Sequence, residues 1–188
     1  MQNTMTFSTT ENRTFSAQLV WMMGFTMLTA IGAQIEIPST PVPFTLQTFF
    51  VLLSGVILGK RNGAISQLLY LSAGIIGAPV FSGFGFGVAK IVGPTGGYLL
   101  SFPVVAFIVG LLVERLRTYW GVSASMLFGM FVLFAFGTLH LSAFYLHNFS
   151  ESVEKGFLIF SIWDIAKLFS AAGIAHAILR HRDTQIKE

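Results

Sequence analysis

The chain has 188 residues, of which 54% are hydrophobic and only 10% are charged, whereas soluble domains carry roughly 25% charged residues. This composition excludes an ordinary soluble domain, and the net charge of +3 does not indicate nucleic-acid binding, because the basic residues fall between long apolar runs where they report membrane topology. The chain contains no cysteine, which excludes disulfides, thiolate metal sites and a cysteine nucleophile.

The apolar runs predict an all-α integral membrane protein with six transmembrane helices. A bilayer core about 30 Å thick requires roughly 20 apolar residues in a helix, with a range of about 17 to 25. By this measure the spans are residues 15–33, 44–58, 63–76, 97–113, 122–146 and 157–179. Residues 1–14 then form an N-terminal tail, residues 15–180 the membrane domain, and residues 181–188 a C-terminal tail.

The connections between spans predict the topology. The polar segment 59–63 joins the second and third spans and predicts a tight helical hairpin. Lys and Arg collect in cytoplasmic loops, and eight of the eleven basic residues fall on one predicted side: Arg13, Lys60, Arg61, Arg115, Arg117, Arg180, Arg182 and Lys187. Both tails are therefore expected in the cytoplasm, with segments 34–43, 78–96 and 147–156 facing outward.

Two of the outer segments have an unusual composition. Loop one (residues 34–43) contains three prolines, which fix φ and favour extended backbone before them, so a stiff non-helical lid is expected. Loop three (residues 78–96) alternates glycine with phenylalanine, and glycine allows a close approach of backbone to ligand. Loop three is either a flexible surface connection or part of a ligand site. Phe81, Phe84 and Phe86 favour the ligand site, since they need apolar burial or an apolar ligand.

Asp164 and Lys167 lie in the otherwise apolar sixth span. An ionised side chain near the middle of a membrane costs about 2.5–3.5 kcal/mol on insertion scales, so such residues usually face the bundle interior or a water-filled cavity. Their spacing places them on one helix face, roughly 10–15 Å below the outer end of the span. They predict the floor of a pocket open to the outside, the alternative being a salt bridge that only orients helices.

The remaining polar residues restrict the chemistry. Gln47 and Gln67 can serve a ligand or an interhelical hydrogen bond equally well. His140 and His176 lack metal-ligand spacing, and Asp164 is the only carboxylate within a span. We therefore expect no catalytic residues, no metal and no cofactor, which argues against an intramembrane enzyme. Neither glycine cluster continues into Lys-Ser or Lys-Thr, so any ATP hydrolysis must come from other chains.

Several motifs together resemble the BioY family, the biotin-specific S components of energy-coupling factor (ECF) transporters. The resemblance is carried by segments 28–35, 41–48 and 77–83, by Gly93-Pro94-Thr95-Gly96-Gly97-Tyr98, and by Asp164-x-x-Lys167. It implies an S-component fold in the cytoplasmic (inner) membrane, with biotin bound beneath loops one and three. It also implies three kinds of partner besides lipid, namely biotin, a transmembrane T component and two cytoplasmic ATPase subunits.

The resemblance also implies roles for individual residues. Asp164 would bind the ureido group of biotin and Lys167 its carboxylate, which fits charge-assisted hydrogen bonding. Gln47, Phe84 and Tyr98 would complete the site. An asparagine in the glycine loop and an arginine after the Gly-Gly-Tyr tyrosine, used by some family members, are replaced here by Gly85 and Leu99. Lys90 is hypothesised to supply the missing positive charge.

The first span is expected to contact the T component through small residues four apart, Thr26/Ala30 and Thr29/Ala33. Packing within the chain explains the same spacing equally well. The function implied by the resemblance is biotin capture and import as the substrate-binding subunit of an ATP-driven importer. The alternative is a stand-alone facilitator or secondary transporter, which usually shows internal repeats with paired broken helices, whereas the two halves of this sequence are not visibly similar.

Overall fold

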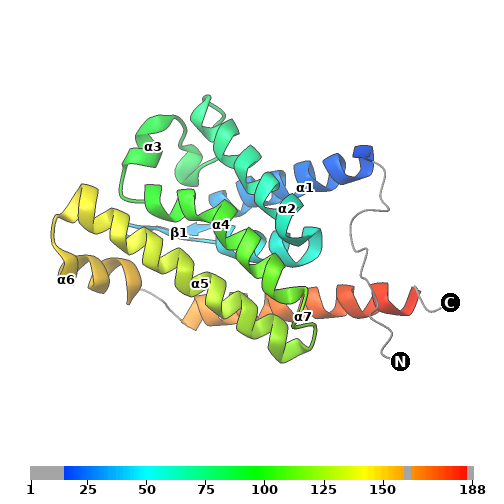
Figure 1. Cartoon of the computed structure of the whole chain (residues 1–188). Coiled ribbons are helices and arrows are strands. Elements are labelled where there is room, and N and C mark those ends of the chain that lie inside the picture. The colour runs from blue at the N-terminus through cyan, green and yellow to red at the C-terminus, as the bar shows by residue number, and fades with distance from the viewer. Residues whose placement is uncertain (1–14, 159–161, 186–188) are drawn as a thin grey trace.

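In the computed structural model, which describes residues 15–158 and 162–185, the apolar runs form a bundle of helices (Figure 1). The helices are α1 (Phe15–Gln34), α2 (Gln47–Ile75), α3 (Val88–Val92), α4 (Gly96–Val113), α5 (Tyr119–Leu141), α6 (Phe149–Ser152) and α7 (Ile162–Gln185). Single helical turns are η1 (Ser82–Phe84), η2 (Ser142–Leu146) and η3 (Val153–Phe157), and the strands are β1 (Glu36–Ile37) and β2 (Phe44–Thr45). The predicted N-terminal tail and residues 186–188 lie outside the described residues.

The predicted hairpin lies within α2, which breaks at Gly59. This residue has φ 80° and ψ 172°, a conformation that glycine adopts without the steric cost of a Cβ atom. The two arms run antiparallel, because Ser54 accepts a hydrogen bond from Gln67 at 3.1 Å and Gln47 donates to Tyr70. The hairpin is confirmed, but its turn is tighter than predicted, since residues 60–63 are already helical.

Short elements of secondary structure form in two of the segments predicted to face outward. Loop one is non-helical after Gln34, as expected, and β1 within it pairs antiparallel with β2, which directly follows it. Segment 147–156, predicted to connect the fifth and sixth spans, contains α6 and most of η3. The Asn148 side chain accepts a hydrogen bond from the Glu151 N–H at 3.2 Å, and such a cap starts a helix.

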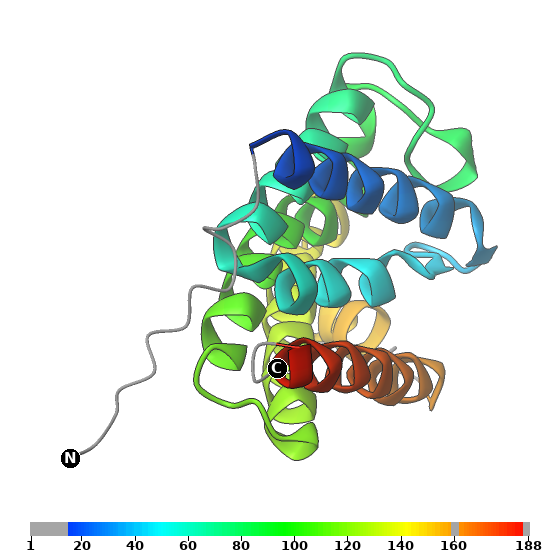
Figure 2. The same ribbon diagram turned by 90° about the vertical axis from the view of Figure 1, so that its right-hand side faces the viewer.

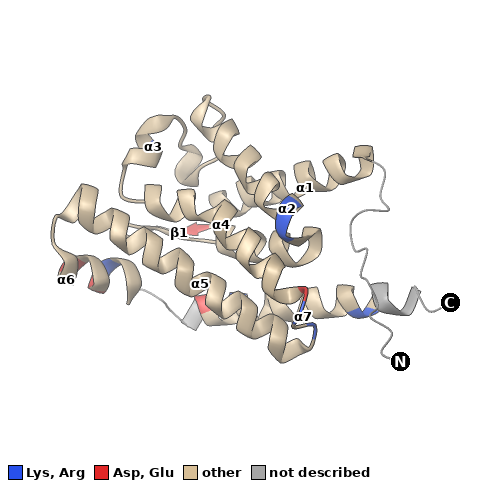
Figure 3. Cartoon of the chain, in the orientation of Figure 1, with Lys and Arg blue, Asp and Glu red and all other residues tan. Residues whose placement is uncertain are grey.

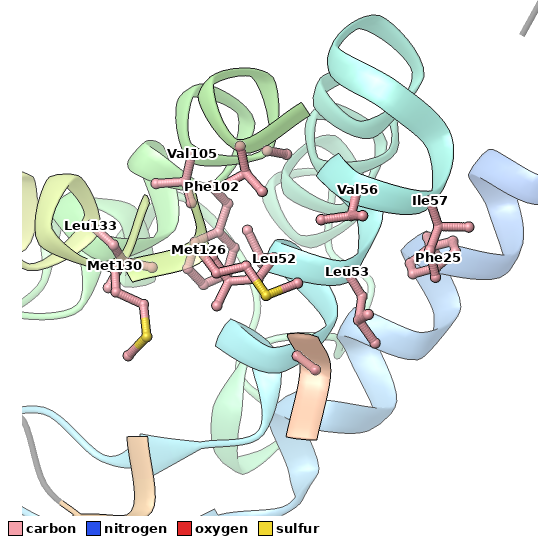
Figure 4. Close-up of a cluster of buried hydrophobic side chains, with 14 of the residues drawn as sticks. Phe25, Leu52, Leu53, Val56, Ile57, Phe102, Val105, Met126, Met130 and Leu133 are labelled. Carbon is pink, nitrogen blue, oxygen red and sulfur yellow. The ribbon is translucent and has the colours of Figure 1, made fainter. Parts of the chain in front are cut away.

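The core lies where α2, α4 and α5 meet. Helix α4 packs between α2 and α5, α1 covers another side of α2, and α7 packs against both α2 and α5 (Figures 1 and 2). Figure 4 shows Leu52 and Val56 of α2 close to Phe102 of α4 and Met126 of α5, all of them buried. This packing fixes the relative positions of α2, α4 and α5, which contribute residues to a cavity.

Four of the described helical segments are long and apolar enough to cross a membrane, namely α1, α2, α4 and the continuous α5–η2 segment. Large apolar side chains cover their outer surface, for example Val20, Met27 and Phe131. Charged residues sit mostly near helix ends and in connections (Figure 3). Helix α2 alone holds two of the predicted spans. The number of six spans and the cytoplasmic position of both tails stay predictions.

The two ends of the bundle differ in charge. The start of α1, the break in α2, the α4–α5 connection and the end of α7 lie at one end (Figure 1). Lys60 and Glu114 form an ion pair there, at 2.8 Å. Loops one and three and α6 lie at the opposite end. The segments predicted to face outward therefore share one end, away from the basic connections.

Candidate ligand-binding site

A cavity of about 60 Å³, here called the inner cavity, lies among β2, α2, α4, α5 and α7. Its lining residues are Val42, Pro43, Phe44, Thr45, Gln47, Thr48, Ser82, Thr95, Tyr98, Leu99, Phe102, Leu133, Phe134, Asp164 and Lys167. Four of the seven residues predicted for ligand binding, Gln47, Tyr98, Asp164 and Lys167, therefore meet in one place. Mostly apolar walls with a few convergent polar groups are typical of small-molecule sites.

Asp164 and Lys167 form the charged side of the inner cavity. The Lys167 Nζ lies 2.6 Å from the Asp164 Oδ1, and the Lys167 side chain is 16% exposed while that of Asp164 is 3% exposed. The ammonium also donates to the Thr45 carbonyl at 3.0 Å and to the Thr48 hydroxyl at 3.2 Å. Three acceptors thus match the three protons of the ammonium. The pair both ties α7 to the start of α2 and faces the cavity.

The pair lies near the start of the described part of helix α7. Within Ile162–Gln185, Asp164 lies in the first turn and Lys167 one turn further on. Residues 159–161 lie outside the described residues, so the depth of 10–15 Å below the outer end of the span stays a prediction.

Aromatic side chains form the apolar wall. The Tyr98 hydroxyl donates to the Gly156 carbonyl at 2.8 Å, so η3 is held over this side of the cavity. The ring of Tyr98 meets Phe134 edge to face with the centroids 6.3 Å apart. Leu99 also lines the cavity, so at this position the wall is apolar.

The two glutamines of α2 have different surroundings. Gln67 donates to Thr29 and Ser54 and is fully buried away from the inner cavity, so its amide holds α1 and the two arms of α2 together. Gln47 lines the cavity and is itself partnered, because its Oε1 accepts from the Thr45 hydroxyl at 2.9 Å. Gln67 therefore serves bonding between helical segments, whereas Gln47 makes such a bond and also lines the inner cavity, so that a ligand role for Gln47 stays a prediction.

Lys90, Gly85 and Phe84 are not among the described residues that line the inner cavity. The Lys90 ammonium donates to the Ser82 carbonyl at 3.2 Å and lines an outer cavity of about 310 Å³ together with Glu36. Its stem lies so close to Gly85 that an added Cβ would be 2.2 Å from the Lys90 Cε. Phe84 is 68% exposed. The structure therefore places these three predicted ligand residues around the outer cavity or on the surface.

The outer cavity adjoins the inner one. Pro43 of loop one and Ser82 of loop three line both. Gln34 at the end of α1 fixes loop three, because its amide donates to the Phe81 carbonyl at 3.1 Å and accepts from the Phe84 N–H at 3.0 Å. The boundary between the two cavities is thus made by loops one and three.

The small residues of α1 pack inside the chain. Thr29 and Ala33 are fully buried, and the Thr26 hydroxyl donates to the Ser66 carbonyl of α2 at 2.8 Å. Ala30 is half-buried and packs against the core. Thr29 and Ala33 are thus covered within the described part of the chain, which favours the interpretation of packing within the chain for these two, while a contact of α1 with a T component stays a prediction.

Sequence reasoning missed several residues of the inner cavity. Thr45 and Thr48 lie in segment 41–48, which carried the family resemblance, so their position was a usable signal. Phe102 and Phe134 lie in uniformly apolar spans, where the sequence does not distinguish a cavity-facing ring from a lipid-facing one.

Known proteins resemble this chain over most of its length. The BioY family model matches residues 1–184. The chain is 43% identical over 158 residues to the biotin transporter BioY of Thermotoga maritima, covering 84% of this chain and 93% of that protein. It is 41% identical over 154 residues to the probable biotin transporter BioY of Pyrococcus horikoshii, covering 82% and 91%.

A solved structure shows the same fold. The crystal structure of the S-component for biotin from an ECF-type ABC transporter superposes with a TM-score of 0.80 at 26% identity, covering 88% of this chain and 92% of that chain. The family resemblance seen in the sequence is confirmed. The chain belongs to the BioY family and is a multi-pass protein of the cell membrane.

Proposed function

We propose that this protein captures biotin from outside the cell and imports it across the cytoplasmic membrane as the substrate-binding subunit of an ECF transporter. The observation that carries the proposal is the inner cavity, where the Asp164/Lys167 pair faces aromatic walls. Biotin combines an apolar bicyclic ring, two ureido N–H donors and a carboxylate. The names of the similar proteins, biotin transporter and S-component for biotin, support the same ligand.

Each part of biotin has a chemical counterpart in the cavity. The Asp164 carboxylate accepts hydrogen bonds from the ureido N–H groups, and the Lys167 ammonium binds the ligand carboxylate. The rings of Tyr98, Phe102 and Phe134 cover the apolar ring system and chain. A single buried pair of opposite charges suits a ligand that offers donors at one end and an anion at the other.

Cavity size indicates that the two cavities act together. Small-molecule sites usually measure about 300–1,000 Å³, whereas the inner cavity measures about 60 Å³ and the outer one about 310 Å³. Biotin therefore needs the boundary at Pro43 and Ser82 to move aside. Loops one and three, which carry these two residues, therefore form the entrance for the ligand.

Six spans with both termini in the cytoplasm are part of the proposal. Support comes from the basic end of the bundle, where Lys60 and Arg61 follow the first arm of α2 and Arg115 and Arg117 follow α4, because cytoplasmic connections are enriched in Lys and Arg. The outer cavity then opens outward. The sequence has no phosphate-binding loop, so a T component and two ATPase subunits supply the energy.

Uptake of radiolabelled biotin tests the proposal. The full chain is produced in biotin-auxotrophic cells that lack other biotin carriers, with and without a T component and its ATPases. We expect ATP-dependent uptake only when the partners are present. Equal uptake without them would instead establish a stand-alone transporter, and absence of uptake with the partners assembled would contradict the proposed function.

A further inference from the structure

We propose that Tyr70 is a positioning residue for ligand binding, which couples the charged side of the inner cavity to loop three. The inference rests on the proposed function, since it concerns how the same site holds its ligand. Tyr70 lies on the second arm of α2 behind the lining of the inner cavity, and it is 0% exposed. Its importance comes from what it touches.

Tyr70 contacts three separate parts of the site. Its hydroxyl accepts a hydrogen bond from the Gln47 amide and donates to the Val80 carbonyl of loop three at 3.1 Å. Its ring meets Phe81 edge to face at 5.5 Å and lies nearly parallel to Phe102 at 6.2 Å. Gln47 and Phe102 line the inner cavity. The Tyr70 side chain therefore contacts two residues that line the inner cavity, Gln47 and Phe102, and also loop three.

The hydroxyl of Tyr70 belongs to a continuous chain of hydrogen bonds. It has a single proton, which goes to Val80, so it must accept from the Gln47 Nε2. The Gln47 Oε1 is then free to accept from the Thr45 hydroxyl at 2.9 Å, and the Thr45 carbonyl accepts from Lys167 at 3.0 Å. Each link fixes the orientation of the next, from the ammonium to loop three.

The series of hydrogen bonds from Lys167 to Tyr70 ends on loop three. Val80 and Phe81 directly precede Ser82, which lines both cavities. A ligand carboxylate that binds Lys167 competes with the acceptors of the ammonium, and of these the Thr45 carbonyl belongs to the short strand β2. A shift of Thr45 reaches Val80 through Gln47 and Tyr70. Occupancy of the cavity thereby changes the hold on loop three.

The test compares Tyr70→Phe with the matched control Tyr119→Phe in the full-length protein. Tyr70→Phe keeps the buried ring but removes the hydroxyl, whereas Tyr119 is a half-buried tyrosine of α5 whose ring contacts Trp120 and His176. Two quantities are measured, the affinity for biotin by calorimetric titration and the hydrogen–deuterium exchange of backbone amides in residues 80–87. Gln47→Leu interrupts the same chain from the other side.

We expect Tyr70→Phe to weaken biotin binding by about 10-fold and to speed exchange selectively in residues 80–87, with no change in Tyr119→Phe. The double variant with Gln47→Leu should bind no more weakly than the worse single variant, because both break one chain. Wild-type affinity and wild-type exchange in Tyr70→Phe would overturn the inference, as would faster exchange throughout the chain. If the wild type fails to bind biotin, the proposed function fails, while exchange without ligand still decides the link between Tyr70 and loop three.

Discussion

Replacing Lys167 by methionine tests whether the ammonium binds the ligand carboxylate. The perturbation keeps an unbranched side chain that is one heavy atom shorter and removes the charge. The ammonium is largely buried, with 16% of the side chain exposed, so the bond to a carboxylate is little weakened by solvent. A hydrogen bond to a charged group contributes about 1.5–3 kcal/mol, which corresponds to roughly 10- to 150-fold in affinity.

The assay uses two ligands, biotin and biotin methyl ester, which differ in the charge of the carboxyl group. Wild-type protein should bind biotin about 10- to 150-fold more tightly than the ester, and Lys167→Met should lose this preference. The ratio of two affinities in one variant does not depend on the fraction of folded protein. Lys155→Met serves as the control, because Lys155 is exposed and pairs only with the surface residue Glu151 among the described contacts. An undiminished preference in Lys167→Met would refute the assignment of Lys167.

Three further changes distinguish the site from the scaffold. Lys90→Ala should change the equilibrium affinity for biotin by less than about 2-fold in calorimetric titration, because its ammonium already donates to the Ser82 carbonyl and a partly exposed hydrogen bond contributes little. A loss of about 10-fold would restore Lys90 as a ligand residue. Gln67→Leu should lower the free energy of unfolding by about 1–3 kcal/mol, since it leaves buried hydroxyls without their amide partner. The biotin affinity of the folded fraction should stay unchanged, and a loss of affinity would contradict the separation of Gln67 from the site. Gly59→Ala should destabilise the protein by about 1–3 kcal/mol, because φ is 80° and ψ 172° at the hairpin turn. An unchanged midpoint of thermal unfolding would contradict that turn geometry.

Helix boundaries could be predicted where apolar runs end at polar or glycine residues. Helix α1 ends at Gln34 and α4 begins at Gly96, each within one residue of the sequence prediction. The helical segment 149–157 was not predicted, because its first turn, α6, starts at the Asn148 cap rather than within a long apolar run. Run length therefore identified the long helices but not the short ones.

The charged half of the site could be predicted, and its supporting residues could not. Asp164 and Lys167 stood out because charges are rare in an apolar span. Tyr70 gave no such signal, because an aromatic residue in an apolar helix is ordinary and its partners, Gln47 and Val80, are distant in sequence or lie in a loop. Lys90 was assigned to the ligand from its loop alone, and only the fold shows that its stem crosses Gly85 toward Ser82.

Direct binding of biotin to the purified full-length protein is the measurement that tests the central claim. Calorimetric titration of the protein in detergent, without partner subunits, should show saturable binding of about one biotin per chain, which is lost in Asp164→Asn because the amide adds donors where the site needs acceptors. Absence of saturable binding by the wild type, or equal binding by Asp164→Asn, would contradict the assignment of the inner cavity as a biotin site.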